Sequence, residues 1–258
     1  MKFRIVLVLL LIGKLCFSQT QLDSLMQALK QPDFDKMSDA KDLLENYQKE
    51  AIPKLIELLK DISSQKINNS MDLIYPGSDK YYGHGRIVYY DLDWVCVRAA
   101  WVLEEITFQD FGYCDTSITE AKLFALQMKN YSEYLKKGYY DVDFKSKKSK
   151  GELKKYYLTL ADSVSKWWEK NKNTWTRSAA LKEALGSTNV ERQGLAIQYL
   201  RYGETKCDGL TVEYYMAELK PLVEEISKMK NSESSRAQSL LNDKDNNWFK
   251  SKTKKNNP

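Results

Sequence analysis

The sequence predicts an all-α protein, and three observations lead to this expectation. Apolar residues recur at the i, i+3, i+4, i+7 spacing of amphipathic helices over most of residues 20–241, and strict alternation is rare. Gly and Pro number only 11 and 5 in 258 residues, and they fall mainly between the periodic segments. One pattern of two consecutive helices occurs twice, which is typical of repeat architectures.

The expected helices follow one another along the chain with short breaks. Pro53 suits a first helical turn, Asp93 is expected as an N-cap, and Gly112 is a stop signal. The expected helical segments are 22–29, 38–47, 51–61, 93–108, 118–137, 151–172, 176–185, 190–202, 212–229 and 234–241. The inner face of segment 38–47 is expected to carry Ala40, Leu43, Leu44 and Tyr47.

Residues 63–92 interrupt the helical pattern as an irregular insert. They carry four Gly or Pro residues, five tyrosines and the one histidine of the chain. We expect a short hairpin around 83–85, with 86–90 as one of its strands. The insert has two compatible roles: it covers the apolar edge of the helices, or it forms a recognition surface.

The repeated pattern is carried by residues 180–200 and by 52–61 joined, across the insert, to 93–106. In the second helix of each pair, Arg98 matches Arg192 and Ala100 matches Gly194. Small residues are expected at the latter position because two helices approach closely there.

This pattern resembles HEAT-like repeats of exported bacterial proteins. The resemblance implies a right-handed stack of antiparallel helix pairs, that is, a HEAT-like superhelix. In that family a loop Asp or Asn and an early Arg often form a polar ladder between repeats. Carried over by position, Asp61 or Asp93 would pair with Arg98, and Asn189 with Arg192. The inserted ~30 residues depart from the short connections of the family.

The helix expected after Asp93 mixes charge with apolar residues. Its apolar positions wrap most of the circumference, so the helix is expected to be buried on nearly all sides. A buried Arg98 then requires charge pairing and hydrogen bonds, and the acids expected to supply them are Asp91, Asp93, Glu104 and Glu105. We interpret Arg98 mainly as a structural brace and not as a ligand clamp.

The two ends of the chain predict export and a basic tail. Residues 1–18 have the basic start, apolar run and small residues of a secretory signal peptide, and Cys16 offers a less favoured lipoprotein alternative. Residues 19–241 are expected to form one helical domain, and 242–258 a disordered basic tail. Much of the formal net charge of +5 lies in these two ends. Nucleic acid is therefore not an expected partner, and no membrane span is expected.

Three cysteines remain after the predicted cleavage, namely Cys96, Cys114 and Cys207. Cys114 and Cys207 lie in turn-like sequence, which makes them the candidate pair for one disulfide, although sequence does not fix connectivity. The chain has a single histidine and no CxxC pair, so no metal site or other cofactor is expected.

No catalytic motif appears, and the candidate binding residues lie in the insert. His84 has no visible nucleophile or second acid to work with, so we expect a protein without enzymatic activity. Tyrosine and arginine are favoured at interfaces, and the predicted contact residues are Tyr81, Tyr82, His84, Arg86, Tyr89 and Tyr90.

The leading hypothesis is an exported, non-enzymatic protein that binds another macromolecule, in the first place a protein, through the insert and the helical surface. A periplasmic immunity or inhibitor protein directed against a toxin or enzyme is the alternative. A hydrolase that uses His84 is a third hypothesis.

Overall fold

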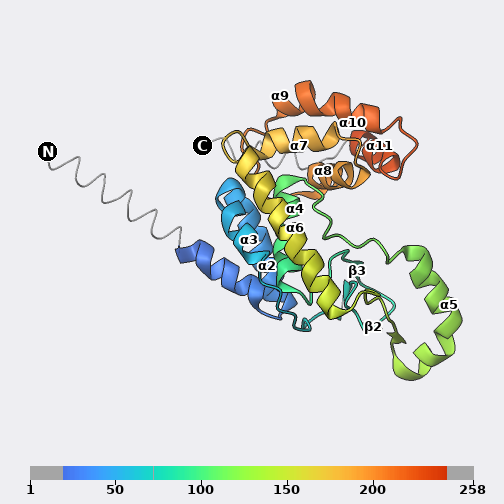
Figure 1. Cartoon of the computed structure of the whole chain (residues 1–258). Coiled ribbons are helices and arrows are strands. Elements are labelled where there is room, and N and C mark those ends of the chain that lie inside the picture. Colours follow the sequence, from blue (N-terminus) through green and yellow to red (C-terminus); the bar gives the residue numbers. More distant parts are fainter. Residues whose placement is uncertain (1–19, 72, 243–258) are drawn as a thin grey trace.

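The computed structural model describes residues 20–71 and 73–242, and it is mostly helical (Figure 1). The predicted signal peptide, 1–18, and residues 243–258 of the predicted tail lie outside the described residues. Among the residues that are described, no helix combines the length and apolar character that a membrane crossing requires.

The elements agree with the expected helical segments in type and order. A helix over 20–30 is followed by α2 (Phe34–Tyr47), a short 3-10 turn η1 (Gln48–Glu50), α3 (Ile52–Leu58), β1 (Leu73–Ile74), β2 (Lys80–Tyr81), β3 (Arg86–Ile87), α4 (Val95–Thr107), α5 (Glu120–Lys137), β4 (Tyr140–Asp141), α6 (Lys150–Asn171), α7 (Arg177–Leu185), α8 (Val190–Tyr202), α9 (Val212–Tyr214), a π-helical turn η2 (Tyr215–Leu219), α10 (Lys220–Ile226) and α11 (Ser234–Asn242).

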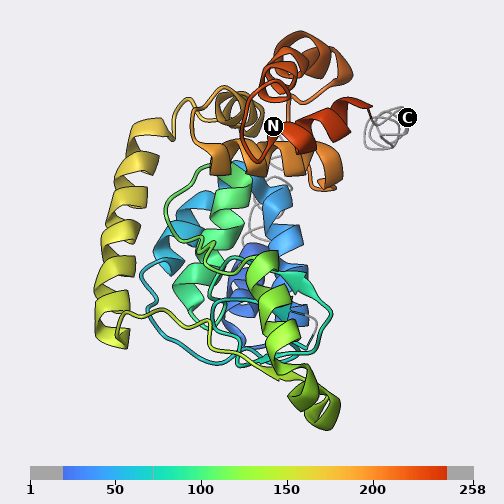
Figure 2. The ribbon, with the colours of Figure 1, turned by 90° about the vertical axis from the view of Figure 1, so that its right-hand side faces the viewer.

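The helices form two packed groups that meet at α4. Helices α2 and α3 pack against α4, while α7 packs against α8 and α10 packs against α11. Contacts of α4 with α7 join the groups, and Figures 1 and 2 show the C-terminal helices at one end of the molecule. The long α6 runs along one side and contacts α3, whereas α5 stands apart from the other helices.

Helix α4 lies at the centre of the main hydrophobic core. Twelve of its 13 residues are buried, as its nearly continuous apolar circumference predicted. Ala100 has no exposed surface. At the matching position of α8, a Cβ on Gly194 would lie only 3.3 Å from the Glu233 carboxylate, so the expected close approach is real there.

The start of α4 differs from the predicted cap, whereas its end agrees with the prediction. Trp94, and not Asp93, occupies the N-cap position. The first free amides are satisfied where the insert begins, because Val95 N donates to Ser63 O and Cys96 N to Asp61 O, both at 3.1 Å. The helix ends at Phe108 in a left-handed conformation (φ 51°), which agrees with the expected segment 93–108, and Gly112 lies beyond its end.

The buried face of α2 also differs from the prediction. Leu43 is 48% exposed, while Lys41 and Glu45 are buried beside Ala40 and Leu44. The buried stripe is therefore rotated by a fraction of a turn, and it carries two charges into the interior.

The predicted hairpin in the insert is wrong. β1 pairs in parallel with β3, and β2 pairs in antiparallel with β4, about 60 residues away in sequence. A two-residue strand is stabilised little by pairing with the next strand in the sequence. Its pairing partner is therefore decided by how the segment packs in the tertiary structure. Several insert residues belong to the main core: Ile67, Leu73, Tyr75, Val88, Tyr90 and Leu92. The insert therefore folds back onto the helices, as one of its two expected roles requires.

Candidate functional site

Two adjoining cavities form a groove across the middle of the molecule. Their volumes are about 460 and 760 Å³, and they share Glu105, Leu195 and Gln198. The smaller cavity lies between α2, α4 and α8, and the larger one between the insert, the segment before α5, and α8 with α11. Nine carboxylates line the two cavities against three cationic side chains, Lys41, Arg86 and Arg236. We call this feature the acidic groove; its acids are Asp42, Glu45, Glu104, Glu105, Asp110, Glu120, Glu191, Glu204 and Glu233.

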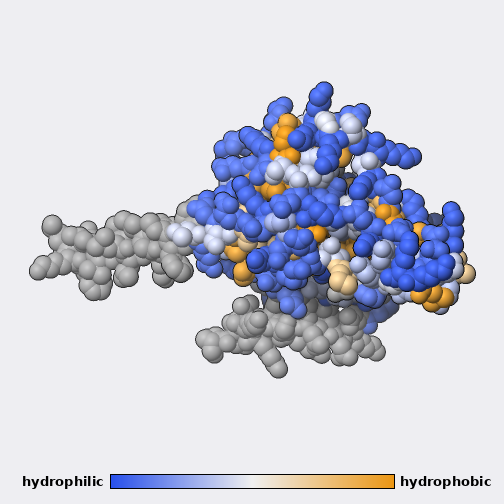
Figure 3. All heavy atoms as spheres, turned by 90° about the horizontal axis from the view of Figure 1, so that it is seen from below, coloured by the Kyte–Doolittle hydropathy of each residue, from blue (hydrophilic) through white to orange (hydrophobic). Residues whose placement is uncertain are grey.

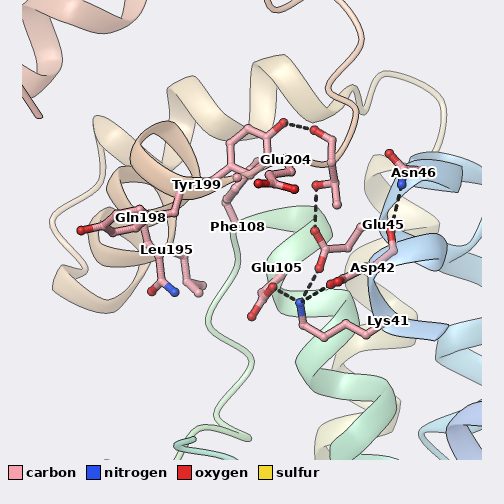
Figure 4. A pocket seen from close by; sticks show the side chains of 13 residues that line it. Lys41, Asp42, Glu45, Asn46, Glu105, Phe108, Leu195, Gln198, Tyr199 and Glu204 are labelled. Atoms are coloured by element: carbon pink, nitrogen blue, oxygen red, sulfur yellow. Dashed lines mark hydrogen bonds and ion pairs between the residues drawn. The ribbon is translucent and has the colours of Figure 1, made fainter. Parts of the chain in front are cut away.

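A buried ammonium group organises the smaller cavity (Figure 4). Lys41 Nζ lies 2.5 Å from a carboxylate oxygen of Glu45 and 2.5 Å from one of Glu105. The same ammonium lies 5.0 Å from the centroid of the Trp101 ring, which adds a cation–π contact. Helices α2 and α4 are thereby joined by a charge network at their interface.

Arg177, the first residue of α7, closes this network from the other side. It is 1% exposed and donates to the second carboxylate oxygen of Glu45 at 3.2 Å. Thr205 Oγ1 donates to the same Glu45 oxygen at 2.8 Å and accepts from Arg177 at 3.1 Å. The guanidinium carbon lies 4.7 Å from the Tyr199 ring centroid. Three helices and the loop after α8 meet at Glu45.

Two opposing effects set the pKa values in this network. Burial disfavours the charged form of each group, and contact with an opposite charge favours it. Burial acts to lower the pKa of Lys41, but Glu105 and Glu45 raise it overall. Burial acts to raise the pKa of Glu45, but Lys41 and Arg177 lower it overall. Glu105 keeps a raised pKa, because burial and the nearby Glu45 charge outweigh the attraction of Lys41. Lys41 and Glu45 are therefore held in their charged forms.

Glu104 sits in the larger cavity without a cation in direct contact. Burial raises the pKa of this carboxyl to about 7, although hydrogen bonds from the Tyr90 hydroxyl and the Phe111 amide oppose the shift. Those bonds measure 2.7 and 2.8 Å. Burial also raises the pKa of Tyr90 well above its ordinary value, and its ring stacks on Trp101 at 5.7 Å between centroids.

The groove receives three of the six predicted contact residues. Arg86, Tyr89 and Tyr90 line the larger cavity, so the end of the insert does meet the helical surface. Arg86 is exposed, and its guanidinium also lies over the Phe34 ring at 5.2 Å.

The other three predicted contact residues lie beside α5 and outside the groove. Tyr81 is buried, accepts from Gln127 Nε2 at 3.0 Å, and stacks on Tyr140. Tyr82 is half-buried. Its ring stacks on the ring of His84, which is exposed, and also contacts the ring of Tyr139. The six residues are therefore divided between two places and do not form one surface.

The predicted ion pair of Arg98 is corrected by the structure. Arg98 is fully buried, as expected, but its guanidinium donates to main-chain oxygens of Leu29, Lys30, Gln31, Gln65 and Leu92 at 2.5–3.3 Å.

The two proposed partners of Arg98 have contacts of their own. Asp93 accepts from the Tyr75 hydroxyl at 2.8 Å and from Ile67 N at 3.1 Å. Asp61 accepts from Ser63 and pairs with Lys30 at 3.5 Å. Chain ends and turns expose carbonyls that can replace carboxylates as partners of a buried Arg. Arg98 remains a structural brace, but through hydrogen bonds to the backbone.

The second pair carried over by position, Asn189 and Arg192, meets at the main-chain amide of Arg192. Asn189 caps α8 by accepting from Arg192 N at 3.0 Å, and its side-chain amide donates to Asp110. The Arg192 side chain reaches back to Phe108 O at 3.0 Å.

The predicted Cys114–Cys207 disulfide is not formed, since Cys114 is a free thiol. Cys114 lies in the larger cavity, where burial and Glu104 raise its pKa to about 12. Cys207 is buried in the loop after α8, beside Tyr199 and on the side where Gln48 contacts Asp208. Similar turn-like sequence around the two cysteines did not mean proximity.

Sequence reasoning missed the Lys41, Glu45 and Arg177 network. A usable signal was the i, i+4 spacing of Lys41 and Glu45, one position after the apolar Ala40 and Leu44. Arg177 carried no comparable signal, because its contact with Glu45 spans 132 residues.

The groove presents carboxylate charge and aromatic surface. Its buried carboxylates are engaged by ammonium, guanidinium, hydroxyl or amide donors. Within residues 20–71 and 73–242, no group of three or more His, Cys, Asp or Glu side chains could hold a metal ion. No family model, curated protein or solved structure matches this chain.

Proposed function

We propose that this protein is an exported, non-enzymatic binding protein that recognises a basic segment of a partner protein in the acidic groove. Its scaffold would be a HEAT-like stack in which α3 with α4 and α7 with α8 are the two repeats. The packing of each of these pairs supports that arrangement.

The observation that carries the proposal is the charge of the groove rim. Five of its carboxylates are exposed to solvent, and among the described residues that line the groove they face two exposed cations, Arg86 and Arg236. Arg236 is itself paired with Glu233 at 3.2 Å. Complementary charge steers association and suppresses partners of the wrong sign, so lysines or arginines of a partner fit this groove. The exposed rim acids are Asp42, Asp110, Glu120, Glu191 and Glu204.

Aromatic surface inside the groove supports binding of a protein segment over a free ion. Tyr89 and Tyr90 line the larger cavity together with Trp101, and Tyr199 and Tyr202 line the smaller one. Tyr and Trp supply large contact areas at low entropic cost and are enriched among residues that dominate binding energy.

Capture of partners from a cell-envelope extract tests this function. Glu191→Gln/Glu204→Gln neutralises two exposed rim acids, and we expect the recovered partner to fall at least about fivefold at low salt. Glu57→Gln/Glu169→Gln, on exposed residues outside the groove, is the matched control and should retain the partner. Equal recovery by both double variants, at both low and high salt, would contradict the proposal.

A further inference from the structure

Helix α5 presents an exposed apolar stripe that the fold does not use. Phe124, Met128, Tyr131 and Leu135 are 57–68% exposed and follow one another at spacings of four, three and four residues. Residues at these spacings lie along one side of a continuous helix, and the kink at Asn130 divides the stripe into Phe124 with Met128 and Tyr131 with Leu135. The helix packs on the insert and on β4 through a neighbouring side, where Leu123 is buried and Tyr134 stacks on Tyr140 at 4.6 Å.

The same region carries the strongest positive charge of the described chain. Residues 118–157 hold ten lysines against five acids, a net charge of +5. In α5, Lys122, Lys129 and Lys136 recur every seven residues and are exposed. The seven-residue spacing places them along one side of the helix, away from the apolar stripe.

The shape of α5 suits an extended, flat partner. The helix projects from the body in two perpendicular views (Figures 1 and 2). Figure 3 shows hydrophobic patches at the right-hand side of the molecule, the side on which Figure 1 places α5. Asn130 has a non-helical conformation (φ −114°, ψ 20°) and kinks the helix between Met128 and Tyr131. A kink interrupts the straight seam that a partner helix needs, whereas a lipid surface adapts to it.

We propose that α5 docks this protein on an anionic lipid bilayer. Phe124, Met128, Tyr131 and Leu135 would enter the boundary between headgroups and acyl chains, and the lysines of 118–157 would contact anionic headgroups. Amphipathic helices bind in this way, and each Lys near an anionic surface strengthens the attraction to it. This surface is separate from the acidic groove, so the inference does not depend on the proposed partner protein.

Co-sedimentation with vesicles tests the docking. The protein, purified from the exported fraction, is mixed with vesicles of phosphatidylcholine alone or with about 30 mol% phosphatidylglycerol. We expect binding to the anionic vesicles and at least about tenfold weaker binding to the neutral ones. Raising the salt should reduce the bound fraction, since the lipid surface potential is screened.

Matched variants locate the contact. Phe124→Ser/Met128→Ser should lower the affinity for anionic vesicles at least about tenfold. Met216→Ser/Met229→Ser removes two exposed methionines elsewhere and should bind like the unchanged protein. Lys129→Gln/Lys136→Gln should weaken binding mainly at low salt. Circular dichroism checks that each variant remains folded.

Three outcomes would overturn the proposal. The protein fails to bind anionic vesicles at low salt, or the Phe124 and Met128 variant binds as well as the Met216 and Met229 control. The third is a dimer in light scattering that the α5 variant abolishes while vesicle binding is unaffected. That result would assign the stripe to a second copy of the chain.

Discussion

Two buried arginines in this protein are held by different kinds of acceptor. Arg98 is 0% and Arg177 1% exposed, and each holds several segments together. Arg98 donates to five main-chain carbonyls around the end of the first described helix, the insert and the start of α4. Arg177 donates to carbonyls as well, but also to the Glu45 carboxylate and the Thr205 hydroxyl.

The difference shows that burying a guanidinium requires acceptors and does not require a carboxylate beside it. Neutral carbonyls at helix ends and turns lack intrahelical partners and can supply the acceptors. For Arg98, burial lowers the pKa and the nearby acids Asp93, Asp91 and Asp61 raise it without direct contact. The main-chain carbonyls around Arg98, which we call the carbonyl cradle, do not titrate in acid. A carboxylate partner such as Glu45 does.

The largest effect is expected from Arg98→Ala. It would leave five main-chain carbonyls without their donor, two of them in buried bonds and three in partly buried bonds, and each buried loss costs about 1–3 kcal/mol. We expect the free energy of unfolding in urea to fall by at least about 4 kcal/mol. Arg98→Lys keeps the charge but not the forked donors, and should recover only part of this loss. A decrease under about 1 kcal/mol for the alanine variant would show that the cradle is not a brace.

Arg177→Met should cost somewhat less at neutral pH, about 3 kcal/mol, because Lys41 and Thr205 still contact Glu45. Its dependence on pH should distinguish the two arginines. Arg177 helps to lower the pKa of Glu45, so the stability it contributes is present above the unfolded pKa and is lost as pH falls through the folded value. The difference between wild type and Arg177→Met should therefore shrink in acid. A difference that stays constant down to low pH would contradict this account.

Glu104→Gln shows what a buried carboxylate does without a cation in contact. Its pKa of about 7 lies above the ordinary value, so the folded protein holds this proton longer and loses stability as pH rises from about 4.5 to 7. Glutamine keeps the shape without the charge. We expect it to raise the free energy of unfolding by about 1–2 kcal/mol at pH 8 and to leave it unchanged near pH 4. Destabilisation at pH 8 would contradict the raised pKa.

Thr205→Val should have the smallest effect, because the hydroxyl links two charged groups, Arg177 and Glu45, that also contact each other directly. Loss of this link should cost about 1–2 kcal/mol in thermal or urea unfolding. Thr205→Ser keeps the hydroxyl and serves as the control. If valine and serine were equally tolerated, the link between Arg177 and Glu45 would carry little weight.

The spacing of apolar residues predicted most helices of this protein. The buried face of a helix is formed by residues that are close in sequence, so a local pattern reveals it. The burial of α4 and Arg98 followed from the near-continuous apolar run around them. The details that failed depend on residues far away in sequence. The partner of β2 is β4 and not β3, and the acceptors of Arg98 include carbonyls 67–69 residues before it.

The candidate site was predicted only in part for the same reason. Arg86, Tyr89 and Tyr90 reach the groove because the end of the insert leads into α4. The acids of the groove come from six separate stretches of chain, and adjacency in sequence does not reveal their convergence. Glu104 and Glu105 are neighbours, yet one binds Tyr90 and Phe111 while the other binds Lys41 and Trp101.

The arm formed by α5 and β4 rests on its own small hydrophobic cluster, which is distinct from the main core. Ile74, Tyr81, Ile118, Leu123 and Tyr140 make up its buried part. A unit held by so few side chains should open without global unfolding. Amide protons of α5 should therefore exchange with solvent earlier than those of α4. A protease should cut the segments that flank the arm while the rest of the protein stays intact.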